Sequence, residues 1–185
     1  MTAWDTLIVQ VSHGKLGGRP SWVCTVIAVA DQSRPRWLNS EQQRIWRAYL
    51  LGSATLQERL DADLRQFGLD LPEYEILVVL SESPDQRRRM SELANAVHHS
   101  RSRLTHTISR MEKAKLVSRT SCPSDRRGVW ANLTDEGMEL LRTAAPGHVA
   151  AVRRNFVDAV SPDDFRALGR AFDAVLEVEG SSPSN

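Results

Sequence analysis

Two short amphipathic segments separated by a turn constrain this chain more than any other feature. Apolar side chains recur at three- and four-residue steps in residues 90–97 and again in residues 104–111, with His98-His99-Ser100 between them. This spacing predicts two helices, each with one buried face. Ser100 is the expected N-cap of the second helix. We therefore expect a helix-turn-helix at the centre of the fold.

A β-hairpin and a concentration of positive charge accompany these helices. Residues 117–120 and 129–133 read as strands, and the connection between them contains Pro123, Asp125 and Gly128. Residues 87–127 hold eleven Lys or Arg but only three Asp or Glu, whereas the net charge of the whole chain is +1. A basic surface on an otherwise acidic body is the electrostatic pattern that a polyphosphate partner requires. The pattern favours DNA binding by a winged helix-turn-helix.

The candidate DNA contacts lie on the polar face of the second helix and on the hairpin. An Arg on such a helix can read guanine in the major groove, and an Arg at a hairpin tip can enter a minor groove. Asp125 is expected to hold Arg127 in place, to form an Asx turn, or both. A solvated charged face is the competing interpretation, which the scarcity of acids here disfavours. The predicted contacts are Ser100, Arg101, Ser102, Arg103, Thr105, His106, Arg110, Asp125, Arg126 and Arg127.

The helices expected on either side carry more apolar surface than one small lobe can cover. A long helix is predicted over residues 39–66, stopped by Gly68, and a short one after Pro72. The spare apolar stripes predict a homodimer. The expected organisation is an extension (1–36), a winged-helix domain (37–179) and a flexible tail (180–185). Within the domain we expect a DNA-binding lobe at 71–134 and dimerisation helices at 39–66, 134–160 (with a kink at Pro146-Gly147) and 161–179.

The first 36 residues permit three interpretations. Lys15 and Arg19 precede an apolar run at residues 22–30, which imitates a secretory signal. The alternatives are a poorly ordered extension rich in Gly, or a natural start downstream near Val26 or Val29. The run is too short to span a bilayer, so no membrane partner is expected. The two cysteines, Cys24 and Cys122, do not define a disulfide framework, and a cytoplasmic location is expected.

Four stretches resemble the multiple-antibiotic-resistance regulator (MarR) family of winged-helix repressors. They are LPEYEILVVL at 71–80, MSELANAV at 90–97, SRSRLTHTISRMEKAKLV at 100–117 and PSDRRGVWANLTDEG at 123–137. The last contains the family's Asp-x-Arg wing signature as Asp125-Arg126-Arg127, and the resemblance extends over residues 37–178. It implies an obligate homodimer on a pseudo-palindromic operator, with Arg127 in the minor groove and Asp125 as its orienting partner.

The resemblance also implies control by a small molecule. Many members release DNA when a phenolic or other lipophilic compound binds between the dimer helices and the DNA-binding lobe. Trp46, Tyr49 and Tyr74 are the candidate pocket residues, although aromatic residues at helical spacing are more often core. Cys24 and Cys122 do not match the position of the cysteine in redox-sensing members. The adjacent His98 and His99 rarely converge on one metal, so they are interpreted as phosphate contacts or solvent-facing residues, and neither a metal nor a cofactor is expected.

The predicted fold is mainly α, a winged helix-turn-helix with a small β-hairpin wing and a helical dimerisation region. The predicted function is a sequence-specific transcriptional regulator, a ligand-responsive repressor in which a ligand changes the spacing of two reading heads. The chain has no Gly-rich phosphate loop and no convincing catalytic pairing, so an enzyme is not expected. The alternative is a winged-helix module that binds protein without sequence-specific DNA binding.

Overall fold

The computed structural model describes residues 36–122 and 125–178, without the side chains of residues 125–127. The predicted N-terminal extension and C-terminal tail lie almost wholly outside these residues. Contacts divide the chain into two units, residues 1–44 and 45–185, and helix α1 (Ser40–Leu64) contains the boundary. In the first unit Asn39 Oδ1 accepts a hydrogen bond from the Gln42 backbone N–H at 2.8 Å, and Gln42 Oε1 accepts one from Asn39 N–H at 3.0 Å. This reciprocal cap starts α1 where the sequence predicted.

In the second unit α1 continues to Leu64 and is followed by a 3-10 turn, η1 (Arg65–Phe67). Gly68 has φ 74° and ends the turn, as predicted, because only glycine adopts this left-handed conformation without strain. Helix α2 (Leu71–Ser81) begins at a capping box that the sequence prediction missed. Asp70 Oδ1 accepts from the Glu73 backbone N–H at 2.8 Å, and Glu73 Oε2 accepts from Asp70 N–H at 3.1 Å.

The charged segment before the helix-turn-helix contains a strand that the sequence did not predict. A 3-10 turn, η2 (Pro84–Gln86), leads into β1 (Arg87–Arg89), which pairs antiparallel with β3. The wing is therefore part of a three-stranded sheet in the order β1-β3-β2 rather than a lone hairpin. Three consecutive arginines carry no alternation of apolar and polar residues, so the sequence gives no strand signal here. Backbone pairing with β3 stabilises the strand instead.

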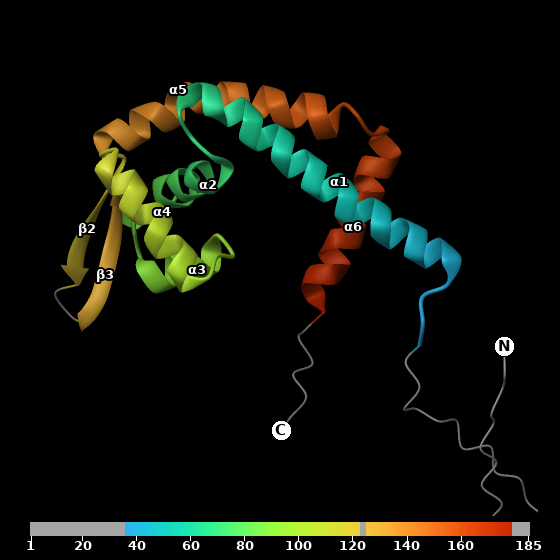
Figure 1. The fold of residues 1–185 in the computed structure, drawn as a ribbon, viewed down its shortest axis with the longest axis horizontal. Coiled ribbons are helices and arrows are strands. Elements are labelled where there is room, and N and C mark those ends of the chain that lie inside the picture. Colours follow the sequence, from blue (N-terminus) through green and yellow to red (C-terminus); the bar gives the residue numbers. More distant parts are fainter. Residues whose placement is uncertain (1–35, 123–124, 179–185) are drawn as a thin grey trace, which may run out of the picture. The chain divides into compact units, whose positions relative to one another are not determined.

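The helix-turn-helix forms as predicted. Helix α3 (Met90–Ala96) and helix α4 (Arg101–Lys113) pack their apolar faces into the core with α2, and Ser100 Oγ accepts from the Arg103 backbone N–H at 3.2 Å. Figure 1 shows α2, α3 and α4 grouped beside the β2–β3 hairpin. The side chains that carry this core are fully or almost fully buried: Leu64, Ile76, Leu77, Leu80, Leu93, Leu104, Ile108, Met111 and Val117.

The wing strands are longer than predicted. Strand β2 (Val117–Cys122) and strand β3 (Asp125–Leu133) pair antiparallel, with a register irregularity between Ser121 and Cys122. The polar residues at their distal ends lack the apolar alternation that marks a half-buried strand, which is why the sequence underestimates their length. Cys122 is 5% exposed, and an Arg89 guanidinium nitrogen lies 3.5 Å from its Sγ. Its place in the sheet explains its burial.

Helix α5 (Asp135–Val152) follows the wing and passes into a π-helical segment, η3 (Arg153–Val157), before the last helix, α6 (Pro162–Glu177). Side chains cap both α5 and α6: Thr134 Oγ1 accepts from Gly137 N–H at 3.0 Å, and Ser161 Oγ accepts from Asp164 N–H at 3.1 Å. α5 continues through Pro146, and its helical pattern changes only at η3. Within the described residues no helix is both long and apolar enough to cross a membrane.

Hydrogen bonds and a close backbone contact form a junction between α5 and the base of the wing. The Thr134 backbone N–H donates to the Leu116 carbonyl at 3.2 Å, and the Thr134 hydroxyl donates to the Lys115 carbonyl at 2.7 Å. Gly137, on the first turn of α5, lies against the same segment. A Cβ added there would lie 2.1 Å from the Leu116 carbonyl oxygen and 2.9 Å from Leu133 Cδ1. Only glycine permits this approach.

We expect Gly137→Ala to destabilise the fold by about 1–3 kcal/mol, because the new methyl group forces the backbone of α5 away from Leu116. Urea unfolding followed by circular dichroism measures the change. Gly52→Ala in α1 is the matched control, since nothing lies within 4 Å of a Cβ there. That substitution should be neutral or stabilising by up to about 1 kcal/mol. Equal stability of the two variants would contradict the junction.

Candidate DNA-binding surface and ligand cavity

The outward face of α4 is polar and basic along its whole length. Leu104, Thr107, Ile108 and Met111 are buried, and the other positions of the helix are exposed or partly exposed. All the residues that the sequence selected on this helix and its cap are exposed: Ser100, Arg101, Ser102, Arg103, Thr105, His106 and Arg110. The Ser100 cap fixes the first turn of the helix, where Arg101, Ser102 and Arg103 lie. The structure therefore brings this part of the predicted surface together.

Arg110 differs from its neighbours because it forms ion pairs within the protein. One guanidinium nitrogen lies 2.7 Å from Asp70 Oδ2 and 3.2 Å from Glu73 Oε1. The hydrogen bond to Asp70 is the main reason that the pKa of Arg110 is raised. Both acceptors belong to the capping box of α2. Arg110 therefore links the exposed basic face of α4, which we call the reading face, to the start of a core helix. Sequence reasoning could not reveal this contact across 40 residues.

A second arginine ties the wing to α4. The Arg119 guanidinium donates to Glu112 Oε2 at 2.6 and 3.0 Å, and the Arg119 backbone N–H donates to Glu112 Oε1 at 3.2 Å. This pairing lowers the pKa of Glu112. Beyond it, the backbone of Asp125, Arg126 and Arg127 lies in β3, but their side chains lie outside the described part of the chain. The expected pairing of Asp125 with Arg127 therefore stays a prediction.

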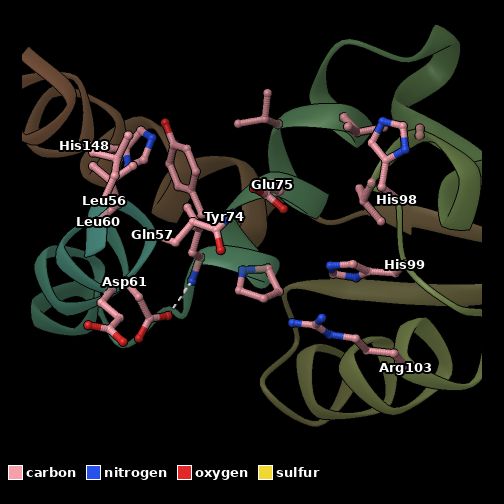
Figure 2. A pocket seen from close by; sticks show the side chains of 17 residues that line it. Leu56, Gln57, Leu60, Asp61, Tyr74, Glu75, His98, His99, Arg103 and His148 are labelled. Carbon is pink, nitrogen blue, oxygen red and sulfur yellow. Dashed lines mark hydrogen bonds between the residues drawn. The ribbon is translucent and has the colours of Figure 1, made fainter. Parts of the chain in front are cut away.

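A cavity of about 890 Å³ lies behind the reading face, among α1, α2, the α3–α4 turn and α5. Figure 2 shows His99 and Arg103 on one side of it and Tyr74 and His148 on the other. Arg103 thus lines the cavity and also belongs to the exposed face of α4. Leu56, Leu60 and Val78 supply apolar lining. The lining mixes apolar side chains with polar and ionisable ones, among them the carboxylates Glu58, Asp61 and Glu75.

Some ionisable groups of the cavity are shifted toward their neutral forms, whereas a hydrogen bond from the Leu71 backbone N–H lowers the pKa of Asp61. Burial lowers the pKa values of His99 and His148, and burial raises the pKa of Glu75 against the opposing effect of Arg103. The Nδ1 atoms of both histidines are buried without a hydrogen-bond partner in the structure. The His148 ring packs against Tyr74 with centroids 4.2 Å apart. Perturbed groups gathered in one cavity are typical of a binding site.

Only one of the three predicted pocket aromatics reaches this cavity. Tyr74 lines it, whereas Trp46 and Tyr49 stack on each other at 5.5 Å, and Tyr49 meets Phe172 of α6 at 6.0 Å. The reason for Tyr49 is its position along the helix, because it lies on the same side of α1 as Leu56 and Leu60 but about two turns nearer the start of the helix. His99, Arg103, Glu75 and His148 were not predicted there, because the cavity combines elements that are distant in sequence. His99 was interpreted as a phosphate contact or solvent-facing residue and instead lines the cavity.

Large apolar side chains on α1 and α6 remain exposed. Trp46 is 51% exposed, Leu51 71% and Leu176 83%, far more than a folded chain usually leaves in contiguous positions. The Tyr49–Phe172 contact joins the two helices into one apolar surface. The exposed Leu51 lies on the opposite side of α1 from Tyr49, whereas the exposed members of the apolar surface are Ile45, Trp46, Tyr49, Leu50, Phe165, Phe172, Val175 and Leu176. We refer to these residues as the apolar face.

A capped recognition helix with a basic outer face, followed by a β-hairpin in a small sheet, defines a winged helix-turn-helix protein. Residues 67–128 match the family model of the MarR family. The chain is 49% identical to AbsC, a MarR family transcriptional regulator from Streptomyces coelicolor, with a TM-score of 0.72 over 77% of this chain and 97% of AbsC. The chain therefore belongs to the MarR family of transcriptional regulators.

Two further relatives extend this finding. Sco3205, a MarR family transcriptional regulator from Streptomyces coelicolor solved in complex with DNA, is 44% identical, with a TM-score of 0.75 over 82% of this chain and 97% of Sco3205. YetL, an HTH-type transcriptional repressor from Bacillus subtilis (strain 168), is 28% identical over 109 residues, 57% of this chain and 65% of YetL. The chain thus spans just under two thirds of that curated relative's length.

We expect the stability of the protein to fall between pH 7.5 and pH 5.5, partly through His148. Its pKa in the folded state is lowered from 6.5, so the unfolded state binds more protons in this window and stability decreases as pH falls. His148→Gln should reduce the loss, as measured by urea midpoints at the two pH values. His106→Gln, on the exposed face of α4, is the control and should lose as much as the wild type. An unchanged pH dependence in His148→Gln would show that this histidine is not responsible.

Proposed function

We propose that this protein is a homodimeric transcriptional regulator that binds a pseudo-palindromic double-stranded DNA operator and represses by occupying a promoter. The observation that carries the proposal is the exposed basic face of α4, capped by Ser100 and adjoining the wing. The 44% identity to Sco3205, which was solved with DNA, supports the same partner here. Repression by occupancy requires no chemical step, so we propose no enzymatic activity. Promoter DNA as the target implies a cytoplasmic location.

The proposed mechanism divides DNA recognition between two elements. Arg101, Arg103, Thr105 and His106 enter the major groove, where Arg can donate two hydrogen bonds to guanine. Arg126 and Arg127, at the distal part of β3, reach the neighbouring minor groove, where negative potential is concentrated. Asp125 is proposed to orient Arg127. Base contacts from α4 supply specificity, and phosphate contacts supply affinity and register.

The apolar face is the proposed dimer interface. Burying it against a second copy removes large side chains of α1 and α6 from water, and this is the main favourable contribution to subunit association. A twofold interface then places two copies of α4 at adjacent turns of a duplex, about 34–36 Å apart. The alternative, a winged-helix module that binds protein only, is favoured if the purified chain retains no genomic DNA at low salt.

The cavity is the proposed site for a small effector. Its apolar wall suits a lipophilic or phenolic body, and His99, Arg103 and His148 offer donors to a polar substituent. Because Arg103 lines the cavity and also belongs to the reading face, an effector held there acts directly on a group that DNA needs. A ligand shifts the DNA equilibrium only by its difference in affinity for the two states.

Arg103→Ala should weaken binding to the operator about 5- to 150-fold, the range for losing one bidentate base contact, and should weaken binding to random duplex much less. The operator is first isolated as a genomic fragment retained by the purified protein, and fluorescence anisotropy then gives both affinities. Arg142→Ala, an exposed arginine of α5, is the control. Equal losses on operator and random DNA would remove the base-reading role of Arg103.

The Arg110 ion pairs are compatible with two roles for Arg110, and the effect of Asp70→Asn on operator affinity distinguishes them. If Arg110 tethers α4 to α2, Asp70→Asn should weaken operator binding, and Arg110→Ala should do so without changing the salt dependence. Asparagine also caps helices well, so this substitution removes the charge while keeping the start of α2. If Arg110 instead binds phosphate and Asp70 restrains it, Asp70→Asn should strengthen binding. Anisotropy titrations at several salt concentrations separate the two roles.

A further inference from the structure

A basic groove of about 440 Å³ lies between the first turn of α4 and the wing. Three arginines from three different elements line it: Arg89 at the end of β1, Arg101 on α4 and Arg119 on β2. The hydroxyl-bearing residues Ser91 and Thr105 also line it, and the buried Leu104 forms part of its floor. The residues described along this groove include no carboxylate. The groove is therefore a concave surface to which three elements each contribute a guanidinium group.

Two of these arginines, Arg119 and Arg89, are positioned by contacts with other side chains. Glu112 accepts from the Arg119 guanidinium at 2.6 and 3.0 Å from the C-terminal part of α4, which fixes that side chain at the base of the wing. The Arg89 guanidinium lies 5.5 Å from the centre of the Trp130 ring, within the range of a cation–π contact. Cations on an ordinary solvated face come from one element and move freely. These two are positioned in advance, which reduces the entropy lost when an anion binds.

The position of the groove identifies its partner. A duplex that receives α4 in its major groove and the wing in the neighbouring minor groove presents the sugar-phosphate strand that separates these two grooves to the space between the two elements. Arg89, Arg101 and Arg119 line that space. Guanidinium groups match phosphate geometry and can bind it through paired hydrogen bonds.

We propose that this groove binds the phosphates of the DNA strand that crosses between the recognition helix and the wing. The inference rests on the proposed DNA-binding function and extends it to Arg89, Ser91 and Arg119, which the sequence did not select. These residues position the duplex and carry no base specificity. The phosphate contact contributes affinity for DNA of any sequence, and base contacts from α4 distinguish one DNA sequence from another.

The test measures DNA affinity against salt concentration for Arg89→Gln, Arg119→Gln and the wild type. Each lost phosphate contact should lower the slope of log K against log salt by about 0.9, on operator and on random duplex alike. Arg119→Lys keeps the charge and should retain most of the slope. Arg142→Gln, on α5, is the matched control and should leave both affinities unchanged.

Ser91→Glu tests the groove without removing the Arg119–Glu112 pair. An acidic residue in the first turn of α3 is compatible with the helix dipole, so the fold should be retained, as thermal unfolding can verify. The new carboxylate should repel phosphate and weaken binding about tenfold or more on both kinds of DNA.

The groove assignment is overturned if both glutamine variants keep the salt slope of the wild type, or if a folded Ser91→Glu binds DNA as tightly as the wild type. In either case the wild type must itself bind the operator. Failure of the wild type to bind any duplex overturns the proposed function instead.

Discussion

The burial of one face of α4 is the constraint on which the rest of the molecule depends. Leu104, Ile108 and Met111 are at most 1% exposed, and they hold the helix against α2, α3 and the sheet. Because an α-helix has only one rotational setting that buries these three positions together, its arginines are directed outward by the same packing. The core thus determines the orientation of the surface that contacts DNA. A loosely packed core would leave that surface without a defined direction.

Ion pairs further restrict the orientation of α4 and the wing, which packing in the core sets. Arg110 joins α4 to the capping box of α2, and Arg119 joins the wing to the end of α4 through Glu112. These pairs are partly exposed, so each contributes only modestly to stability. Their value is geometric, since they limit the positions that the helix and the wing can take relative to each other. A protein that reads a rigid duplex benefits from elements that are set before binding.

The features predicted correctly from the sequence are those that depend on residues close together in the chain. Apolar spacing located α1, α3, α4 and α6, and the cap at Ser100 formed as expected. Strand β1 was missed because Arg87, Arg88 and Arg89 are extended only through pairing with β3. The cavity was mostly missed because His99, Arg103 and His148 converge from elements distant in sequence. Tyr74 was found there, whereas Trp46 and Tyr49 lie on the apolar face.

The contacts at Thr134 and Gly137 attach the start of α5 closely to the base of the wing. Thr134 binds the carbonyls of Lys115 and Leu116, and Gly137 leaves no space for sliding, so the start of the helix and the base of the wing must rotate as one body. Eighteen residues of helix extend about 27 Å, so a tilt of about 5° at this pivot displaces the distal end by about 2 Å. A small rearrangement at the far end of α5 is therefore passed to the wing as a rotation rather than absorbed between them.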